Sequence, residues 1–211
     1  MHLELVQALR CPADHQPTWL VARTDRLEAR HITAGVLGCP ECGAEYPIAR
    51  GVLRLGAPIR ERATEEIGAD PAIRAAALLG LTTPNGVVLL AGAWAHHAVE
   101  VAALTEGVHV IALDAPDEAP PGGLGVSRID AGARVPLGAG VARGIALDSL
   151  HATAEALLQS AGALEPGGRL LAPIRTTMPA GLTVLARDDR WWVAERPPTA
   201  AVVSLTTARR G

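Results

Sequence analysis

Hydrophobic and polar positions follow two different patterns along this chain of 211 residues, and the change comes near residue 57. Before that point, residues 18–22 and 30–33 predict the two strands of a hairpin, and residues 51–56 predict a closing strand. After residue 63, short apolar strands alternate with helical segments, which is the pattern of an α/β layer. We therefore predict a small β-rich module over residues 1–56, a connector over residues 57–66 and an α/β domain over residues 67–211.

Short segments rich in apolar residues, the first of them fully apolar, predict the strands of this second domain. They lie at residues 87–91, 109–114, 126–130, 143–148 and 164–173. Strands without polar alternation are typical of a parallel sheet buried on both faces, and each connection is long enough for a right-handed crossover.

Helical segments separate several of these strands. Asp70 followed by Pro71 predicts an N-cap and a first helical position. We expect two further helices at residues 96–106, ending at Gly107, and around residues 155–159.

The C-terminal part has a different pattern. Residues 182–186 and 191–195 flank a turn and predict an antiparallel hairpin, and residues 202–206 predict one more strand. Because side chains alternate across a strand, we expect one of Trp191 and Trp192 to face the core and the other to face outward.

Three cysteines provide the most specific chemistry of the first module. Cys39 and Cys42 form a C-x2-C pair, and Cys11 precedes them. This spacing is typical of a structural zinc site, whose fourth ligand must come from another residue type. His15 is our first candidate because imidazole is the commoner partner of thiolates. Asp14 and His31 are alternatives. The non-metal interpretation makes Cys11 a buried apolar residue and Cys39 with Cys42 a redox pair.

Composition narrows the class of protein. No apolar run is long enough to span a bilayer, and no basic segment followed by an apolar stretch opens the chain, so we expect a soluble, cytoplasmic protein without a membrane partner. The absence of phenylalanine and the use of arginine for every basic residue indicate a high-GC bacterial genome. A net charge of −3 without a basic cluster gives no sign of an RNA surface, although RNA stays open as a partner.

Two parts of the chain resemble known families. Residues 9–12, 39–42, 46–48 and 51–54 resemble the small zinc-binding activator subunits that partner tRNA, rRNA and protein methyltransferases. Residues 113–114 and 164–170 resemble the class I S-adenosylmethionine-dependent methyltransferase fold. The C-terminal hairpin is similar to that of protein isoaspartyl methyltransferases. The order of the two modules is similar to that of bacterial 23S rRNA guanine methyltransferases. The resemblance implies a zinc-ribbon-like module followed by a Rossmann-like, methyltransferase-type parallel sheet with a C-terminal antiparallel hairpin.

The methyltransferase resemblance also implies cofactor-binding positions. In that fold an acid and alternating glycines follow the first strand, where backbone approaches the cofactor. Here only Gly92 is kept, Leu90 replaces the acid, and Trp94 and His96 replace later glycines. Asp114 stands where an acid binds the ribose.

A second acid, Asp130, stands where a carboxylate follows the third strand and contacts the adenine. Gly92, Asp114 and Asp130 are thus the candidate ligands of S-adenosylmethionine. Such acids also occur as plain strand-end caps. We expect the Trp94 indole to fill the space that the cofactor needs, which makes cofactor binding doubtful.

Two further groups follow strands at the same predicted edge. Asp148 and His151 stand where methyltransferases place catalytic or substrate-positioning residues, and we favour the simpler reading of a helix cap and a first-turn histidine. His96 and His97 are adjacent, so they do not form the i, i+4 pair of a helical metal site. One of them as a general base is the alternative to a solvated helix start.

Three functions compete on this evidence. Our leading hypothesis is a zinc-binding protein whose methyltransferase-like domain is a pseudoenzyme and acts as a scaffold or activator on a protein partner. The second is an active methyltransferase acting on RNA or protein. The third is a different ligand held in the crevice at the topological switch point.

Overall fold

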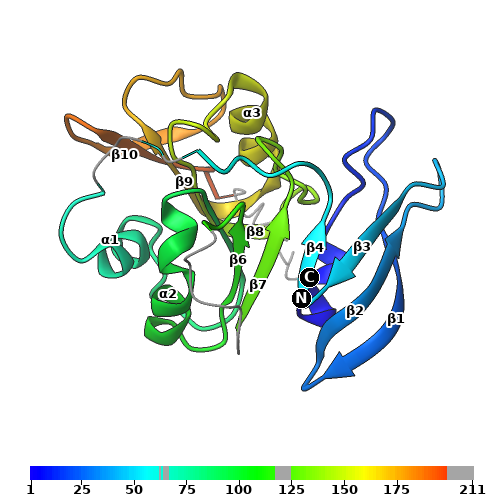
Figure 1. Cartoon of the computed structure of the whole chain (residues 1–211). Coiled ribbons are helices and arrows are strands. Elements are labelled where there is room, and N and C mark those ends of the chain that lie inside the picture. The colour runs from blue at the N-terminus through cyan, green and yellow to red at the C-terminus, as the bar shows by residue number, and fades with distance from the viewer. Residues whose placement is uncertain (62, 64–66, 117–124, 199–211) are drawn as a thin grey trace, which may run out of the picture.

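One mixed sheet of eleven strands runs through the described part of the chain, residues 1–61, 63, 67–116 and 125–198 of the computed structural model (Figure 1). The strand order is β1-β2-β3-β4-β7-β6-β5-β8-β9-β11-β10. The predicted first and second modules therefore contribute to the same sheet.

The N-terminal module is an antiparallel meander preceded by one turn of helix. The 3-10 helix η1 covers Leu3–Ala8, and the strands are β1 (Val21–Glu28), β2 (His31–Gly38), β3 (Glu45–Ala49) and β4 (Val52–Arg54). The predicted hairpin is present as β1 and β2. Both strands are longer than the segments that predict them, and most side chains of β1 are exposed.

The two modules join through backbone hydrogen bonds. Strand β4 pairs in parallel with β7 (Val126–Asp130), which places Leu53 opposite Ile129. A second contact is the bridge between Leu9 and Leu137, where the Gly138 N–H donates to the Ala8 carbonyl at 2.8 Å. A boundary after residue 56 divides the sequence, but the sheet continues across it.

The second module contains the predicted parallel strands. These are β5 (Val87–Ala91), β6 (His109–Leu113), β7, β8 (Ala142–Ala146) and β9 (Leu164–Pro173). Strand β11 (Trp191–Glu195) then pairs antiparallel with β9, and β10 (Thr183–Arg187) forms the edge. This is the methyltransferase-type sheet with a C-terminal hairpin that the resemblance implied. The predicted strand at 202–206 lies outside the described residues.

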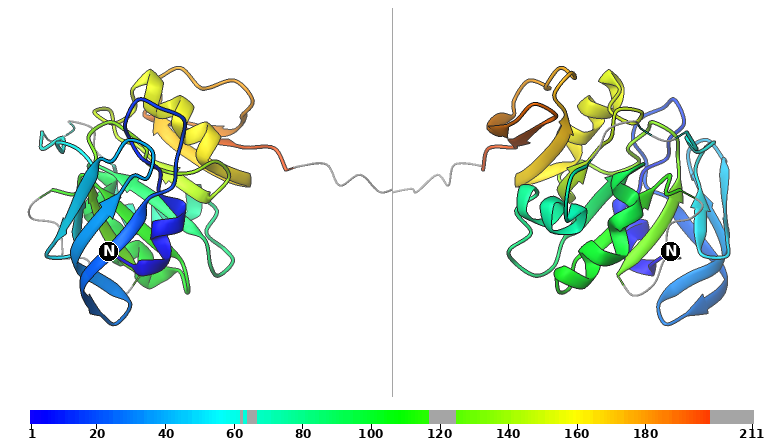
Figure 2. Two further views of the ribbon diagram at one scale, coloured as in Figure 1. Left: turned by 90° about the vertical axis from the view of Figure 1, so that its right-hand side faces the viewer. Right: turned by 60° about the vertical axis from the view of Figure 1, so that its left-hand side comes forward.

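Both faces of the parallel sheet are covered, which explains the uninterrupted apolar run of β5. On one face, Val88 and Leu90 pack with helices α1 (Pro71–Leu78) and α2 (Ala98–Leu104). On the other, Leu89 and Ala91 belong to the cluster that includes helix α3 (Ala154–Ala163) and η1. Figure 2 shows the N-terminal strands at one end of this layered body.

Two predicted helix details are wrong. The segment expected as one helix over 96–106 begins as the 3-10 turn η2 (Trp94–His97) and continues as the shorter α2. Asp70 has a left-handed backbone (φ +49°), and its side chain makes no capping hydrogen bond, so Pro71 begins α1 without that cap. No helix among the described residues is long and apolar enough to cross a membrane.

The prediction that one of the two adjacent tryptophans faces outward is also wrong. Trp191 is 2% exposed and Trp192 5% exposed, because β11 has apolar cover on both faces. Trp191 packs edge to face against Trp94, with ring centroids 5.1 Å apart. The Trp192 indole N–H donates to the Thr176 hydroxyl at 3.0 Å on the opposite face.

The tryptophan pair in the core gives a stability prediction. Trp191→Ala should lower the free energy of unfolding by about 3–5 kcal/mol, since it removes a fully buried indole and leaves a cavity against Trp94. Urea unfolding of the zinc-loaded protein measures this. Trp19→Ala is the matched control: Trp19 is 64% exposed, so the change should stay within about 0.5 kcal/mol. Equal effects of the two variants would contradict the packing described here.

Candidate functional site

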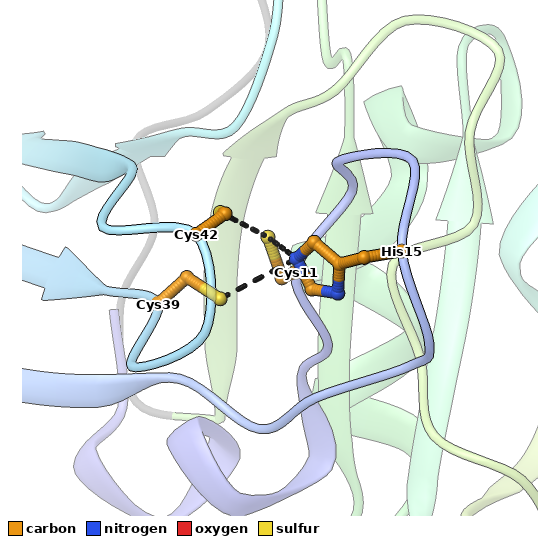
Figure 3. Close-up of side chains that lie close together, drawn as sticks. All are labelled: Cys11, His15, Cys39 and Cys42. Carbon is orange, nitrogen blue, oxygen red and sulfur yellow. Dashed lines mark hydrogen bonds between the residues drawn. The ribbon is translucent and has the colours of Figure 1, made fainter.

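Four side chains of the first module converge on one point (Figure 3). Cys39 follows strand β2, and Cys42 lies in the turn before β3. Gly43 has a positive φ of +71°, which lets its N–H donate to the Cys39 carbonyl at 3.0 Å and closes the turn around both thiols. Cys11 and His15 come from the loop after η1, on the other side of the site.

The distances in this cluster fit a tetrahedral zinc ion. With Zn–S near 2.3 Å and Zn–N near 2.0–2.1 Å, tetrahedral geometry requires about 3.8 Å between sulfurs and about 3.5 Å from sulfur to nitrogen. The Sγ atoms of Cys11 and Cys42 are 3.8 Å apart, and His15 Nε2 lies 3.5 Å from Cys39 Sγ and 3.2 Å from Cys11 Sγ. Three thiols and one imidazole are also a typical donor set for structural zinc.

Hydrogen bonds favour the metal-binding form of Cys39 but not that of His15, whose pKa the hydrogen bonds to the Gln16 carbonyl and to Cys11 raise to about 9. Burial acts to raise the pKa of Cys39, but the backbone N–H groups of Cys42 and Glu41 outweigh it and lower that pKa to about 7. The thiolate is the ligand form, so this shift assists binding at neutral pH. The Tyr46 hydroxyl lies 3.1 Å from Cys11 Sγ, where burial first and this hydrogen bond second raise the pKa of Tyr46.

The other candidates for the fourth ligand lie outside this group. Asp14 is not among the converging side chains, and the His31 ring stacks on His2 instead. The three cysteines are free thiols in the described residues. His15 thus remains our proposed fourth ligand.

A cavity of about 610 Å³ opens at the carboxyl ends of strands β5 and β6 in the second module. The loop after β5 lines it with Gly92, Ala93, His96 and His97, and the end of β6 contributes Asp114. The connector forms another wall, with residues 59–61 among the lining. A crevice at the carboxyl ends of parallel strands is where doubly wound sheets bind ligands.

Asp114 is surrounded by protein donors although it lines this cavity. Its Oδ1 accepts from the N–H groups of Ala131 (2.8 Å) and Gly132 (3.3 Å). Its Oδ2 accepts from the Ile59 N–H (2.9 Å) and lies 3.3 Å from His151 Nε2. A carboxylate has about four lone-pair positions, so all of them have partners within the chain.

His151 bridges Asp114 and Asp148 beneath the cavity. Its Nδ1 lies 2.6 Å from Asp148 Oδ1, and all three residues are 1% exposed. Burial by itself would lower the pKa of His151, but the hydrogen bonds to the two carboxylates and their charges raise it to about 9. The imidazolium therefore has both ring nitrogens available as donors, one to each acid.

The retained glycine of the loop is explained by the same bridge. A Cβ on Gly92 would lie 2.1 Å from Asp148 Oδ2, and the φ of Gly92 is +57°. The next residue, Ala93, donates its N–H to that oxygen at 2.9 Å. The glycine is thus required by the close approach of Asp148.

Asp130, the third candidate cofactor ligand, is paired with the connector. Its Oδ1 lies 3.1 Å from Arg60 Nη2, and Arg60 Nη1 donates to the Ala115 carbonyl at 2.8 Å. Burial raises the pKa of Asp130, and the Arg60 charge acts in the opposite direction. The Arg60 guanidinium therefore lies beside the acid that the resemblance assigned to adenine.

The expectation that Trp94 fills the cavity is wrong. Trp94 is fully buried in the core against Trp191 and is not among the residues that line the cavity. His97 Nδ1 pairs with Glu100 Oε2 at 3.1 Å, and His96 lines the cavity beside it.

Sequence reasoning undervalued two residues of this site. The sequence favours His151 as a histidine in the first turn of a helix, although an Asp-x-x-His sequence directly after a buried strand is a usable signal. Arg60 had no signal at all, because its partner Asp130 is seventy positions away in the chain.

Comparison with known proteins gives one family match, in the first module, and several distant structural likenesses. The model of the Trm112p-like protein family matches residues 2–51. No curated protein matches the chain. Solved structures resemble the second module only distantly, at 14% sequence identity for each of the three described next.

Three such structures illustrate this likeness. A possible exported protein from Bordetella parapertussis aligns with 57% of this chain at a TM-score of 0.41, and this chain spans 65% of its length. The antibiotic-resistance methyltransferase Kmr aligns with 66% of this chain and 98% of its own (TM-score 0.43). The tRNA (m1A58) methyltransferase TrmI from Aquifex aeolicus aligns with 66% and 73% (TM-score 0.43). At these scores none of the likenesses carries an argument about function.

The metal centre gives a first test of the site. Cys39→Ser should lose one zinc ion per chain relative to the unaltered protein and unfold the first module, because small metal modules fold with their metal. Elemental analysis and circular dichroism measure the two effects. Asp14→Asn is the matched control, next to His15 but outside the cluster, and should keep its zinc. Unchanged zinc content in Cys39→Ser would place the site elsewhere.

The bridge gives a pH prediction. The folded pKa of His151, about 9, lies above its ordinary value of 6.5. Its contribution to stability is therefore complete below pH 6.5 and is lost as the pH rises through 9. The advantage of the unaltered protein over His151→Gln should shrink by about 3 kcal/mol over this range. Urea unfolding at several pH values measures it, and a constant difference between the two proteins would contradict the bridge.

Proposed function

We propose that this protein is a zinc-stabilised scaffold whose methyltransferase-like domain does not use S-adenosylmethionine and which acts by binding a protein partner. The Asp114 carboxylate already has a hydrogen-bond partner at each of its lone-pair positions, and this observation carries the proposal. Ribose hydroxyls would have to displace donors that are already in place, and a buried polar group that loses its partner costs about 1–3 kcal/mol. Binding of the cofactor ribose would therefore lose existing hydrogen bonds of Asp114 before it formed new ones.

Two further features support the loss of cofactor binding. The Arg60 guanidinium already pairs with Asp130, so an adenine amine would compete with a charged donor. Asp148 approaches the Gly92 backbone closely, in the region where the fold brings its cofactor.

The surface of the first module supports a protein partner. Trp19 is 64% exposed, and Leu3 and Val21 beside it are also exposed. Leu3, Val6 and Trp19 line a shallow groove of about 450 Å³. Exposed aromatic residues are enriched in protein interfaces. Strand β4 is already paired with β7, so a partner would have to use another surface such as this groove.

A methyltransferase or a protein with another small ligand is the alternative, and the cavity favours it. Its volume of about 610 Å³ falls in the range of ligand pockets, about 300–1,000 Å³, and His96 and His97 offer polar groups there. Under this alternative the connector moves aside and frees Asp114 and Asp130.

Calorimetric titration of the zinc-loaded chain with S-adenosylmethionine separates these functions. We expect no binding in the micromolar range, and none in Arg60→Ala, because Asp114 keeps its four partners in that variant. Binding to the unaltered chain that is lost in Asp114→Asn would refute the scaffold and support the methyltransferase. Zinc content and the unfolding midpoint serve as controls for folding.

A further inference from the structure

A second group of metal-ligating side chains lies where the two modules meet, away from the cysteines. His2 and Glu4 come from the start of the chain and of η1, and His109 is the first residue of β6. One ligand atom from each of the three lies within 4.8 Å of the others. Two imidazoles and a carboxylate are therefore as close together as the ligands of a single metal ion.

A third imidazole adjoins this group. The ring centroids of His31 and His109 lie 5.0 Å and 4.4 Å, respectively, from the ring centroid of His2. His31 begins strand β2 and forms a bridge with His2. The start of the chain and strand β6 thus bring His2 and His109 together, although they are more than a hundred positions apart, and His31 adjoins His2.

Hydrogen bonding leaves two nitrogens of this group without a partner. His109 Nδ1 and His31 Nε2 are buried and have no hydrogen bond within the described residues. A buried nitrogen in that state is costly, and a metal ion is one partner that would satisfy it. His31 Nδ1 lies 3.2 Å from the Ala29 carbonyl, a position from which it donates. A histidine that donates one ring N–H to a backbone carbonyl and leaves the other nitrogen bare has the usual form of a metal ligand.

The two carboxylate oxygens of Glu4 contact two different side chains, those of Arg30 and His109. Its Oε1 pairs with the Arg30 guanidinium, and its Oε2 lies 3.6 Å from His109 Nε2. The Arg30 charge opposes a cation nearby, but it also orients the carboxylate so that Oε2 points toward His109. Ligating carboxylates are commonly held by such an outer hydrogen bond.

We propose that His2, Glu4 and His109 bind a divalent transition-metal ion of the zinc class. Imidazole and carboxylate ligands suit Zn²⁺, Ni²⁺ and Co²⁺ and are poorly matched to Ca²⁺ or Mg²⁺. The ion would tie η1 of the first module to β6 of the second. This site is independent of the cysteine cluster and of the proposed function.

Zinc stoichiometry of the full chain, prepared without an N-terminal extension, tests the proposal. After equilibration with a small excess of Zn²⁺, elemental analysis should find two ions per chain in the unaltered protein and one in His109→Ala. Glu4→Gln should also bind one. It changes an exposed side chain to one of the same shape, which guards against a folding defect in His109→Ala.

His97→Ala is the matched control. His97 also pairs with a glutamate, but it lies on η2 outside the cluster, so this variant should keep two ions. One ion in the unaltered protein would overturn the proposal. So would two ions in both His109→Ala and Glu4→Gln, or loss of the second ion in His97→Ala alone.

Discussion

The bridge of Asp114, His151 and Asp148 is the interaction on which the second module depends. Asp114 follows β6 and Asp148 follows β8, so the imidazolium between them joins loops that leave different strands at one edge of the sheet. The N–H groups of Ile59, Ala93 and Ala131 add contacts from the connector and from the ends of β5 and β7. Two buried carboxylates repel one another, and the cation between them makes their burial tolerable.

Much of the fold could be predicted from local patterns. Strand β5 is apolar throughout because both of its faces are covered, and a run of that kind is visible in the sequence. The prediction for Trp192 failed because both faces of β11 are covered. Alternating side chains place one set in solvent only where one face of the sheet is exposed. The pairing of β4 with β7 could not be foreseen, because a three-residue strand chooses its neighbour through contacts far away in the chain.

The two candidate sites differ in how much of each could be predicted from the sequence. The cysteine cluster is built from a turn and one loop, so the spacing of Cys39 and Cys42 was enough to indicate a metal. The crevice is built from long-range contacts. Position alone made Asp114 and Asp130 plausible cofactor ligands, whereas their partners His151 and Arg60 come from other segments. Trp94 was misjudged because the alignment to a glycine position could not show that its ring points into the core.

The protonation state of His151 tests this account most directly. Nitrogen NMR of the zinc-loaded chain at about pH 8 reports whether each ring nitrogen carries a proton. The bridge predicts an imidazolium with both nitrogens protonated, because its pKa is raised to about 9. A neutral ring with one protonated nitrogen, titrating near 6.5, would show that one of the two carboxylates receives no proton from the imidazole and would contradict the account.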